Sequence, residues 1–289
     1  MRLLVWLVPA LLLVGLGYWL FILTEGAYLG PRAVRLLYDW GAKSYDQVKA
    51  YDQGDDAWNL AIPLEKRLRG WREPLILDVG TGTGRVILSL LRRPDFQGRL
   101  VGLDLSLPML QEARRKVRGY GCPVSLIWQE ACLLPFPDRT FAAVACIEAL
   151  EFMPNPTEAL GEMARVLAPG GTLLVSNRAG RDALYFPDRA LGRKRLQALL
   201  DSLSLEEVEM KPWQGYYDLI WAKKRGKPPS RPPGDDICDI LLCPRCRGPL
   251  TCADGGMSCP TCHLLYPSKD GILYLERPLY EDGGTGEDH

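Results

Sequence analysis

The sequence of 289 residues has very little histidine, with only His263 and His289. This scarcity argues strongly against a hydrolase with a Ser-His-Asp triad and against a metal site built mainly from histidines. The chain also lacks net charge, because 35 Lys and Arg residues balance 35 Asp and Glu residues. A strongly cationic nucleic-acid-binding surface is therefore not indicated, and we expect no DNA partner.

The nine cysteines are too few for a disulfide scaffold, and their number is odd. Hydrophobic residues make up 47% of the chain and charged residues 24%, which is ordinary for a folded protein and excludes wholesale disorder. The length indicates one large domain or two modest ones.

Residues 3–23 form an uncharged apolar run at the N-terminus. As a helix with a rise of ~1.5 Å per residue, the run would span roughly 30 Å, the thickness of the bilayer hydrocarbon. Trp6, Tyr18 and Trp19 lie near its ends, where aromatic rings prefer the membrane interface. We therefore predict a transmembrane anchor at residues 1–24. The alternatives are a buried core helix and a cleaved signal peptide, although the apolar region of a signal peptide is usually shorter.

The basic residues around this run are unevenly distributed. Arg2 precedes it, whereas Arg32, Arg35 and Lys43 follow it. Because Lys and Arg accumulate on the cytoplasmic side of a membrane, the bias predicts a single-pass membrane protein with its C-terminal body in the cytoplasm.

Composition divides the rest of the chain into five segments. Residues 25–72 have helix-like spacing and are expected to form two or three short helices that make a lid or cap. In residues 73–225, short apolar runs alternate with helical patterns, which predicts an α/β domain with a parallel sheet. Residues 226–236 are a linker rich in proline and glycine, residues 237–279 a small cysteine-containing module, and residues 280–289 a disordered acidic tail.

The pattern within the α/β domain predicts individual elements. Parallel strands are expected at 75–79, 100–104, 124–128, 141–147 and 171–177, helices at 84–93, 106–119 and 156–167, and a late antiparallel pair at 206–211 and 216–224.

A glycine-rich loop follows the first of these strands, and acidic residues accompany it. Glycines there allow a tight turn and a close approach of the backbone to a ligand. Carboxylates at successive strand ends would repel a pyrophosphate, whereas they would attract S-adenosylmethionine, which carries a sulfonium and an ammonium group and no phosphate. The alternative is that the acids only cap a strand and a helix. The residues concerned are Gly80, Gly82, Gly84, Asp78, Asp104 and Glu130.

Residues 74–177 resemble the class I S-adenosylmethionine-dependent methyltransferases, in particular the type 11 branch that includes quinone-ring C-methyltransferases. The matching stretches are 76–85, 101–114, 130–144 and 156–177. The resemblance implies a Rossmann-like seven-stranded sheet. It also implies cofactor-binding roles: Asp78, Gly80, Thr81, Gly82 and Gly84 at the methionine end, Asp104 at the ribose, Leu105, Glu130 and Ala131 at the adenine, and Tyr45 in the lid. The chain departs from the family at Glu130 and Ala142, where aspartate is usual.

Methyl transfer requires mainly in-line positioning and desolvation, together with a base if the nucleophile is protonated. Glu148 and Glu151, which follow the fourth predicted strand, are candidates for that base. The alternative is that both only line a loop or face solvent, so the catalytic residue stays unassigned.

The C-terminal module contains two CPxC pairs, Cys243 with Cys246 and Cys259 with Cys262. Such pairs present four thiolates to one tetrahedral Zn²⁺, whereas a redox-active site needs a single pair and disulfides need an oxidising compartment. Residues 241–275 resemble the small methyltransferase activator subunit, which in that family docks on methyltransferases of tRNA, rRNA or a release factor and covers an apolar sheet edge. The resemblance implies an intramolecular contact between the module and the methyltransferase domain.

Three functions remain in competition. The first is a membrane-anchored methyltransferase of a small lipophilic acceptor such as a quinone, an isoprenoid or a lipid. The second is a methyltransferase of RNA or of a translation protein, activated in cis by the zinc module. The third is a non-catalytic scaffold that retains a cofactor-binding fold.

Overall fold

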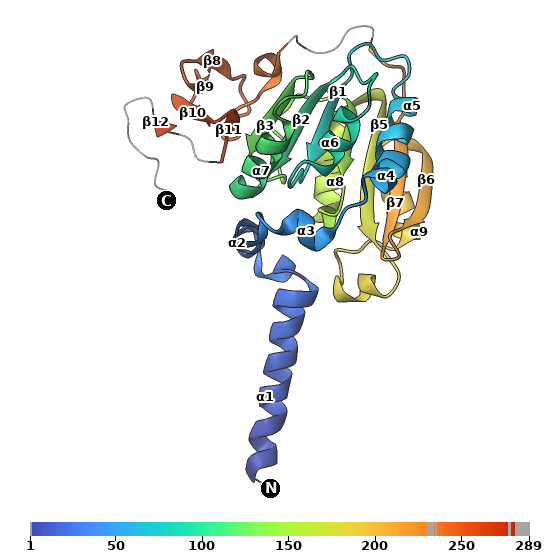
Figure 1. The fold of residues 1–289 in the computed structure, drawn as a ribbon, viewed down its shortest axis with the longest axis vertical. Helices are drawn as coiled ribbons and strands as arrows, with labels where there is room; N and C mark the ends of the chain where they lie inside the picture. The colour runs from blue at the N-terminus through green and yellow to red at the C-terminus, as the bar shows by residue number, and fades with distance from the viewer. Residues whose placement is uncertain (1, 230–233, 235, 277–278, 281–289) are drawn as a thin grey trace.

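The computed structural model describes residues 2–229, 234, 236–276 and 279–280, and Figure 1 shows a long isolated helix below an α/β body. The helix α1 (Arg2–Tyr18) continues into a wider π-helical turn at Trp19–Leu23. Part of the predicted linker and residues 281–289 of the predicted tail lie outside the described residues.

Most of the large apolar side chains of α1 and its π-helical turn are exposed, whereas Trp19, Leu20 and Leu23 are partly exposed. None of the stretch Trp6–Leu23 is buried, and within the described residues it is the one helix whose length and composition would allow it to cross a membrane. Its exposure is inconsistent with the alternative of a core helix.

Several short helices connect α1 to the sheet, where we expected two or three. Asp52 begins one of them as an N-cap, since its carboxylate accepts hydrogen bonds from the backbone N–H groups of Gly54 and Asp55. The elements are a 3-10 turn (Ala27–Leu29), α2 (Pro31–Gly41), α3 (Tyr45–Lys49), α4 (Gln53–Asp56), a π-helical turn (Ala57–Ala61) and α5 (Ile62–Arg67).

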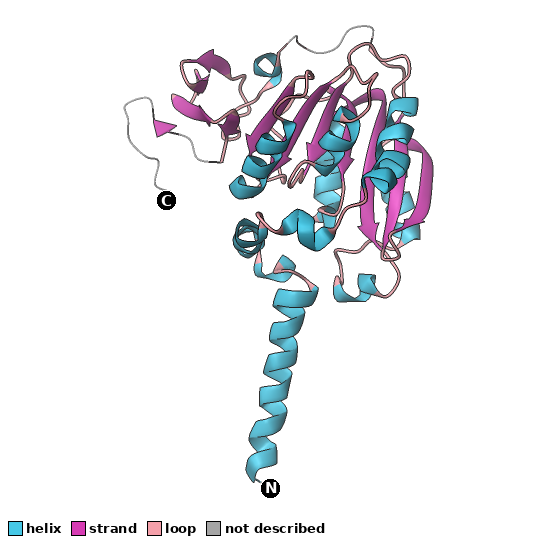
Figure 2. Cartoon of the chain, viewed as in Figure 1, coloured by secondary structure: helices cyan, strands magenta, loops and turns pink. Residues whose placement is uncertain are grey.

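The body is a mixed sheet with helices on both faces, as Figure 2 shows. Its order is β6-β7-β5-β4-β1-β2-β3, in which β5, β4, β1, β2 and β3 are parallel and β7 runs antiparallel to β5 and β6. The strands are β1 (Leu75–Val79), β2 (Arg99–Asp104), β3 (Val124–Trp128), β4 (Phe141–Cys146), β5 (Leu167–Arg178), β6 (Leu205–Trp213) and β7 (Tyr217–Lys224).

The sheet of the body separates two cores, and helices cover each of them. On one face Leu77 packs in a cluster with Leu160 of α8 (Pro156–Val166), and on the other Ile76 packs with Leu88 of α6 (Arg85–Leu91). Alternate residues of β1 therefore contact opposite cores, which explains why all five residues of the strand are buried. The helices α7 (Leu107–Val117) and α9 (Arg193–Ser202) complete the two layers.

The predicted elements are confirmed with two differences. β5 begins at Leu167 rather than at residue 171, and α9 was not predicted. Three short 3-10 helices also lie at Leu150–Phe152, Asp182–Tyr185 and Ile237–Ile240.

The expected seven-stranded sheet needs correction, because the sheet continues from β3 into the C-terminal module. β11 pairs in parallel with β3, and Ile272 lies opposite Leu126. The unpaired backbone groups of an edge strand favour such an addition. The module strands are β8 (Thr251–Ala253), β9 (Gly256–Cys259), β10 (Leu264–Lys269), β11 (Ile272–Tyr274) and β12 (Leu279–Tyr280).

Hydrogen bonds outside the strand pairing also join the module to the body. The backbone N–H of Leu242 donates to the carbonyl of Pro135, and Arg247 Nη1 donates to the carbonyl of Leu134. The structure thus shows the intramolecular contact that we expected between the module and the methyltransferase-like domain.

We expect Ile272→Ala to destabilise the folded chain by about 2–5 kcal/mol, because it leaves a cavity at the junction of β11 and β3. Ile272 is 1% exposed and belongs to the same core cluster as Leu126. Denaturant unfolding of the full chain measures the loss. Thr251→Ala, at an exposed position of β8, is the control, and equal effects of the two changes would contradict tight packing at this junction.

Candidate active site

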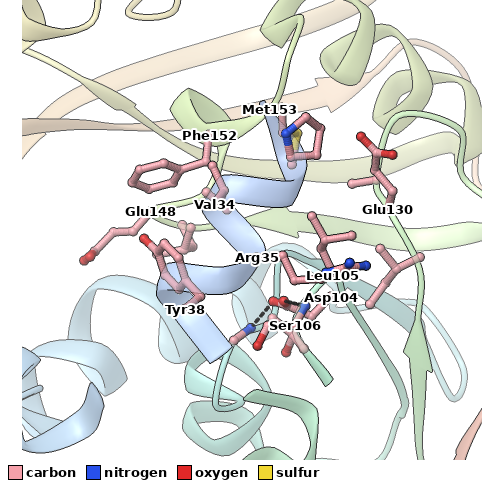
Figure 3. Close-up of a pocket in the computed structure, with 18 of the residues that line it drawn as sticks. Val34, Arg35, Tyr38, Asp104, Leu105, Ser106, Glu130, Glu148, Phe152 and Met153 are labelled. Atoms are coloured by element: carbon pink, nitrogen blue, oxygen red, sulfur yellow. Dashed lines mark hydrogen bonds between the residues drawn. The ribbon is translucent and has the colours of Figure 1, made fainter. Parts of the chain in front are cut away.

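A pocket lies where the carboxyl ends of β1, β2 and β4 meet the helices α2 and α3 (Figure 3). Side chains that follow β2, β3 and β4 form its base and ends, and the lid helices form the opposite wall. The carboxyl edge of a parallel sheet is the usual ligand-binding edge of open α/β folds.

The loop after β1 brings backbone close to this pocket. Gly80 has φ +68°, and a Cβ at this position would lie 2.5 Å from the Cβ of Ala149, so no other residue fits without a shift. The backbone N–H groups of Gly80 and Thr81 both donate to the carbonyl of Leu103 at the end of β2. The loop is therefore fixed against the neighbouring strand.

Two aspartates lie beneath and beside this loop. Asp78 is buried and accepts a hydrogen bond of 2.6 Å from Thr81 Oγ1. Asp104 accepts from the backbone N–H groups of Gly82 (2.7 Å) and Ser106 (2.8 Å). Burial raises the pKa of Asp78 to about 7 and that of Asp104 to about 6. A cation in the pocket would relieve the cost of their ionisation.

Aromatic side chains of the lid, together with Phe152 from the short helix after β4, form one wall of the pocket. The ring of Tyr38 lies 5.8 Å from that of Tyr45 and 5.5 Å from that of Phe152, and the Tyr51 hydroxyl donates to the Tyr45 hydroxyl. Burial raises the pKa of Tyr38 and of Tyr45 well above the ordinary tyrosine value, so both phenols stay neutral. Electron-rich ring faces of this kind attract a cationic ligand.

Glu148 reaches the pocket but is tied into a buried ion-pair network. Its carboxylate lies 2.5 Å from Arg85 Nη1 and 3.2 Å from Lys49 Nζ. Arg85 also contacts Asp56 at 2.6 Å, and its guanidinium lies 3.9 Å from the centre of the Tyr51 ring. Glu148 is therefore engaged in ion pairs with Arg85 and Lys49, which makes it a poor candidate for a free general base.

Glu151, the second candidate base, is turned away from the pocket. It is 1% exposed, and its Oε1 accepts hydrogen bonds from Arg178 Nε (2.7 Å) and the Tyr217 hydroxyl (2.5 Å). This arrangement joins the loop after β4 to β5 and β7, which is a structural contact.

The adenine-end candidates contact both the lid and the C-terminal module. Glu276, just after β11, accepts a hydrogen bond of 3.4 Å from the backbone N–H of Glu130. The same carboxylate lies 4.0 Å from Arg35 of α2. Cys132 donates to the Glu130 carboxylate at 3.2 Å. Figure 3 shows Glu130 and Glu148 at opposite ends of the pocket, with Arg35 and Tyr38 of α2 between them.

Most of the residues predicted from sequence line the pocket, and three do not. Those that line it are Tyr45, Gly80, Thr81, Gly82, Asp104, Leu105, Glu130, Ala131 and Glu148. Asp78 lies behind the loop, Glu151 faces the sheet, and Gly84 caps α6, where a Cβ would meet Ala113. Sequence reasoning missed Tyr38, Tyr51, Phe152 and Arg85, although the density of aromatic residues in 38–52 was a usable clue.

The four cysteines of the CPxC pairs lie together, with all their Sγ atoms within 4.8 Å of one another. The backbone N–H of Gly248 donates to Cys246 Sγ and that of Cys262 donates to Cys259 Sγ. The hydrogen bond from the Gly248 N–H is the main reason that the pKa of Cys246 is lowered to about 7.

A site of four thiols with backbone N–H support fits Zn²⁺, which prefers tetrahedral thiolate coordination. The buried apolar residues of the module, such as Leu250, Met257 and Tyr266, belong to one cluster with residues of the body. In so small a module, a bound metal would add to the folding free energy. Cys252 stays outside this cluster among the described residues.

Comparison with known families assigns two regions of the chain. Residues 76–171 match the family described as Methyltransferase domain, and residues 236–271 match the family described as Trm112p-like protein. The chain therefore combines a methyltransferase domain with a C-terminal Trm112p-like domain.

Curated relatives resemble the first of these regions. Demethylmenaquinone methyltransferase of Thermus thermophilus is 44% identical over 100 residues, which are 35% of this chain and 45% of the relative. The UbiE ubiquinone/menaquinone biosynthesis C-methyltransferase of Hahella chejuensis is 36% identical over 143 residues (46% and 57%). Phosphatidylethanolamine N-methyltransferase of Cereibacter sphaeroides is 39% identical over 124 residues (41% and 58%). The chain thus spans about half the length of the curated relatives it matches.

Solved structures share the fold at low sequence identity. The [4+2]-cyclase SpnF has a TM-score of 0.57 at 20% identity and covers 68% of this chain and 98% of its own. Magnesium protoporphyrin IX methyltransferase of Synechocystis has a TM-score of 0.52 at 17% identity (67% and 96%). One chain of a complex that contains the Haloferax volcanii Trm112 methyltransferase activator has a TM-score of 0.50 at 20% identity (65% and 98%).

We expect the full chain to hold one Zn²⁺, and Cys243→Ser to lose it. Loss of the metal should unfold the module, expose the β3 edge and lower the thermal midpoint of the whole chain. Elemental analysis and thermal unfolding measure both effects. Cys252→Ser should retain the metal and the midpoint, and a metal content that depends on Cys252 would contradict the four-cysteine site.

Proposed function

We propose that this protein is a membrane-anchored S-adenosylmethionine-dependent methyltransferase that acts on a small lipophilic acceptor, such as a quinone, an isoprenoid or a lipid. The observation that carries the proposal is the pocket at the carboxyl edge of the sheet. There, a fixed glycine loop and the carboxylate of Asp104 face an aromatic wall, and the buried carboxylate of Asp78 lies behind the loop. Such a pocket suits a cation that carries no phosphate.

The residues that would hold the cofactor follow from this geometry. Each oxygen of Asp104 accepts one backbone N–H, so each keeps a lone pair for a ribose hydroxyl. The backbone of Gly80 and Gly82 would face the methionine portion, and Leu105, Glu130 and Ala131 the adenine. Asp78 would act from behind the loop in two ways: its negative charge would attract the cationic ligand, and its hydrogen bond with Thr81 would hold the loop in place.

When bound, the cofactor supplies an electrophilic methyl group, and the chain positions and desolvates the reactants. Tyr38, Tyr45 and Phe152 exclude water from the lid side of the pocket, where an acceptor would enter. The ion pair with Arg85 removes Glu148 as a ready proton acceptor, so an acceptor that loses its proton to solvent, without help from a side chain, fits best. A quinol ring, whose carbon becomes nucleophilic on loss of a hydroxyl proton, and a lipid amine are acceptors of this kind.

The anchor supports the lipophilic class of acceptor. A helix that spans the bilayer would keep the pocket close to molecules dissolved in it, which raises their effective concentration. The relatives in quinone biosynthesis and the phosphatidylethanolamine N-methyltransferase act, by their names, on such acceptors. The bias of Arg and Lys favours a body in the cytoplasm, whose reducing conditions also suit a thiolate zinc site.

A second function is favoured by the Trm112p-like domain alone. In this alternative the enzyme methylates RNA or a translation protein, and the module acts as an activator in cis. The neutral net charge of the chain does not support an RNA substrate. A non-catalytic scaffold is the third alternative, because a fold alone does not determine a reaction.

We expect the affinity for S-adenosylmethionine to be highest above pH 7 and to fall as the solution is acidified. The ligand is cationic and favours the ionised aspartates, so it must displace the protons that Asp78 binds below about pH 7 and Asp104 below about pH 6. The loss should approach about tenfold per pH unit where one group titrates. Calorimetry on the full chain measures it. Asp78→Asn should abolish the upper step alone, and affinity that rises on acidification would contradict this assignment.

Incubation of membranes that contain or lack the protein with methyl-labelled cofactor tests the proposed function. We expect label to enter the organic extract only when the protein is present, and Asp104→Ala to abolish it. Ser202→Ala, in an exposed position on α9, is the control that should retain the activity. Label in RNA or protein would support the second function, and absence of label from every fraction would support the third.

A further inference from the structure

One side of α2 is exposed and has an unusual composition. Arg32, Leu36, Trp40 and Lys43, the last just beyond the helix, stand at positions i, i+4, i+8 and i+11 and are all exposed. Leu36 is 66% and Trp40 90% exposed. In a folded domain, large apolar side chains on one side of a helix rarely have such high exposed fractions. We call these four residues the outer face of α2.

The other sides of α2 contact the pocket and neighbouring segments of the chain. Val34, Arg35 and Tyr38 line the pocket, and Asp39 accepts a hydrogen bond of 2.6 Å from Ser106 Oγ. A Cβ at Gly26 would lie 2.9 Å from Leu37 Cδ1, so this side packs closely on the chain that leaves α1. The helix is therefore a wall of the pocket on one side and uncovered on its outer face.

The position of α2 relative to α1 relates this face to the membrane. Figure 1 shows α2 end-on, just above the upper end of α1, so its axis lies across that of α1. If α1 spans the bilayer, α2 then runs along the membrane surface at the point where the chain emerges.

A second exposed apolar segment lies at the same end of α1. Trp19 Nε1 donates to the carbonyl of Tyr185 at 3.2 Å, and the Tyr28 hydroxyl donates to that of Pro187 at 2.6 Å. These bonds hold Leu184, which is 79% exposed, close to the start of the body. The apolar surface of α1 is thus continued by the segments around its end.

We propose that α2 is an interfacial helix whose outer face lies in the headgroup region of an anionic bilayer, so that the membrane surface holds this wall of the pocket in place. The proposal rests on the proposed anchor. Leu36 and Trp40 would enter the boundary of the acyl chains, while Arg32 and Lys43 would contact anionic headgroups.

The charges favour a bilayer over a second copy of the chain. Antiparallel pairing of two outer faces across a twofold axis would bring Arg32 close to Lys43 of the second copy, and like charges would oppose the contact. A bilayer that contains phosphatidylglycerol complements both basic residues. The same helix then forms the pocket wall and the membrane contact, which gives a lipophilic acceptor a short path from the bilayer.

Tryptophan fluorescence of the full chain tests the proposal. The protein is reconstituted in vesicles of phosphatidylcholine and phosphatidylglycerol whose acyl chains carry bromine just below the headgroups. We expect Trp40→Phe to lose a clear share of the quenchable fluorescence. Trp58→Phe, which removes a tryptophan of similar exposure (73%) between α4 and α5, should leave that share unchanged. Trp6→Phe reports on the anchor itself.

The outcomes separate this inference from the proposed function. Quenching of Trp6 without quenching of Trp40 rejects the interfacial helix alone, whereas no quenching of Trp6 rejects the anchor as well. Protection of Trp40 from both the bromines and aqueous iodide would show that protein covers the outer face, and would also overturn the proposal. None of these readouts requires methyl transfer.

Discussion

The pocket depends on the parallel hydrogen bonding that makes β1, β2, β3 and β4 end at one edge of the sheet. The register of β1 with β2 places Asp78 beside Gly102, so the glycine loop after β1 folds directly over the end of β2. Leu103 and Asp104 then accept the N–H groups of that loop. Backbone geometry thus determines the position of the carboxylates, and their burial raises their pKa values.

Arg85 has a comparable role on the other side of the pocket. It is the first residue of α6, and its guanidinium joins Asp56 of α4 to Glu148 after β4 while stacking on Tyr51. A cation enclosed by two carboxylates and a ring holds the lid helices against the sheet. Removal of any one partner would leave a buried charge, so this network constrains the lid more strongly than its separate contacts suggest.

The C-terminal module extends this connection to the opposite end of the pocket. The pairing of β11 with β3 brings Glu276 to the backbone of Glu130 and close to Arg35 of α2. The cysteine cluster, the loop after β3 and the lid helix are therefore linked through a few residues. These contacts connect the module directly to residues that line the pocket.

Much of the architecture could be predicted from the sequence. The strands of the body are short apolar runs bounded by glycine, proline and charge, and hydrophobic periodicity identifies them within a few residues. β5 was predicted to begin at residue 171 because Ala168 to Gly170 resemble a turn, yet Leu167 already pairs with Phe141 of β4. The glycine loop and its acids were identifiable because local backbone chemistry requires them.

The roles of the remaining residues were decided by contacts between distant segments. Glu148 and Glu151 are three positions apart and equivalent as sequence, but one meets Arg85 and the other Arg178 and Tyr217. Spacing also predicted four cysteines around one ion, because two short turns suffice to present them. The sequence alone therefore determined the strands, the glycine loop and the thiol cluster, which depend on neighbouring residues. Only the tertiary structure decided which carboxylates face the pocket and how the module continues the sheet, since those depend on side chains brought together from far along the chain.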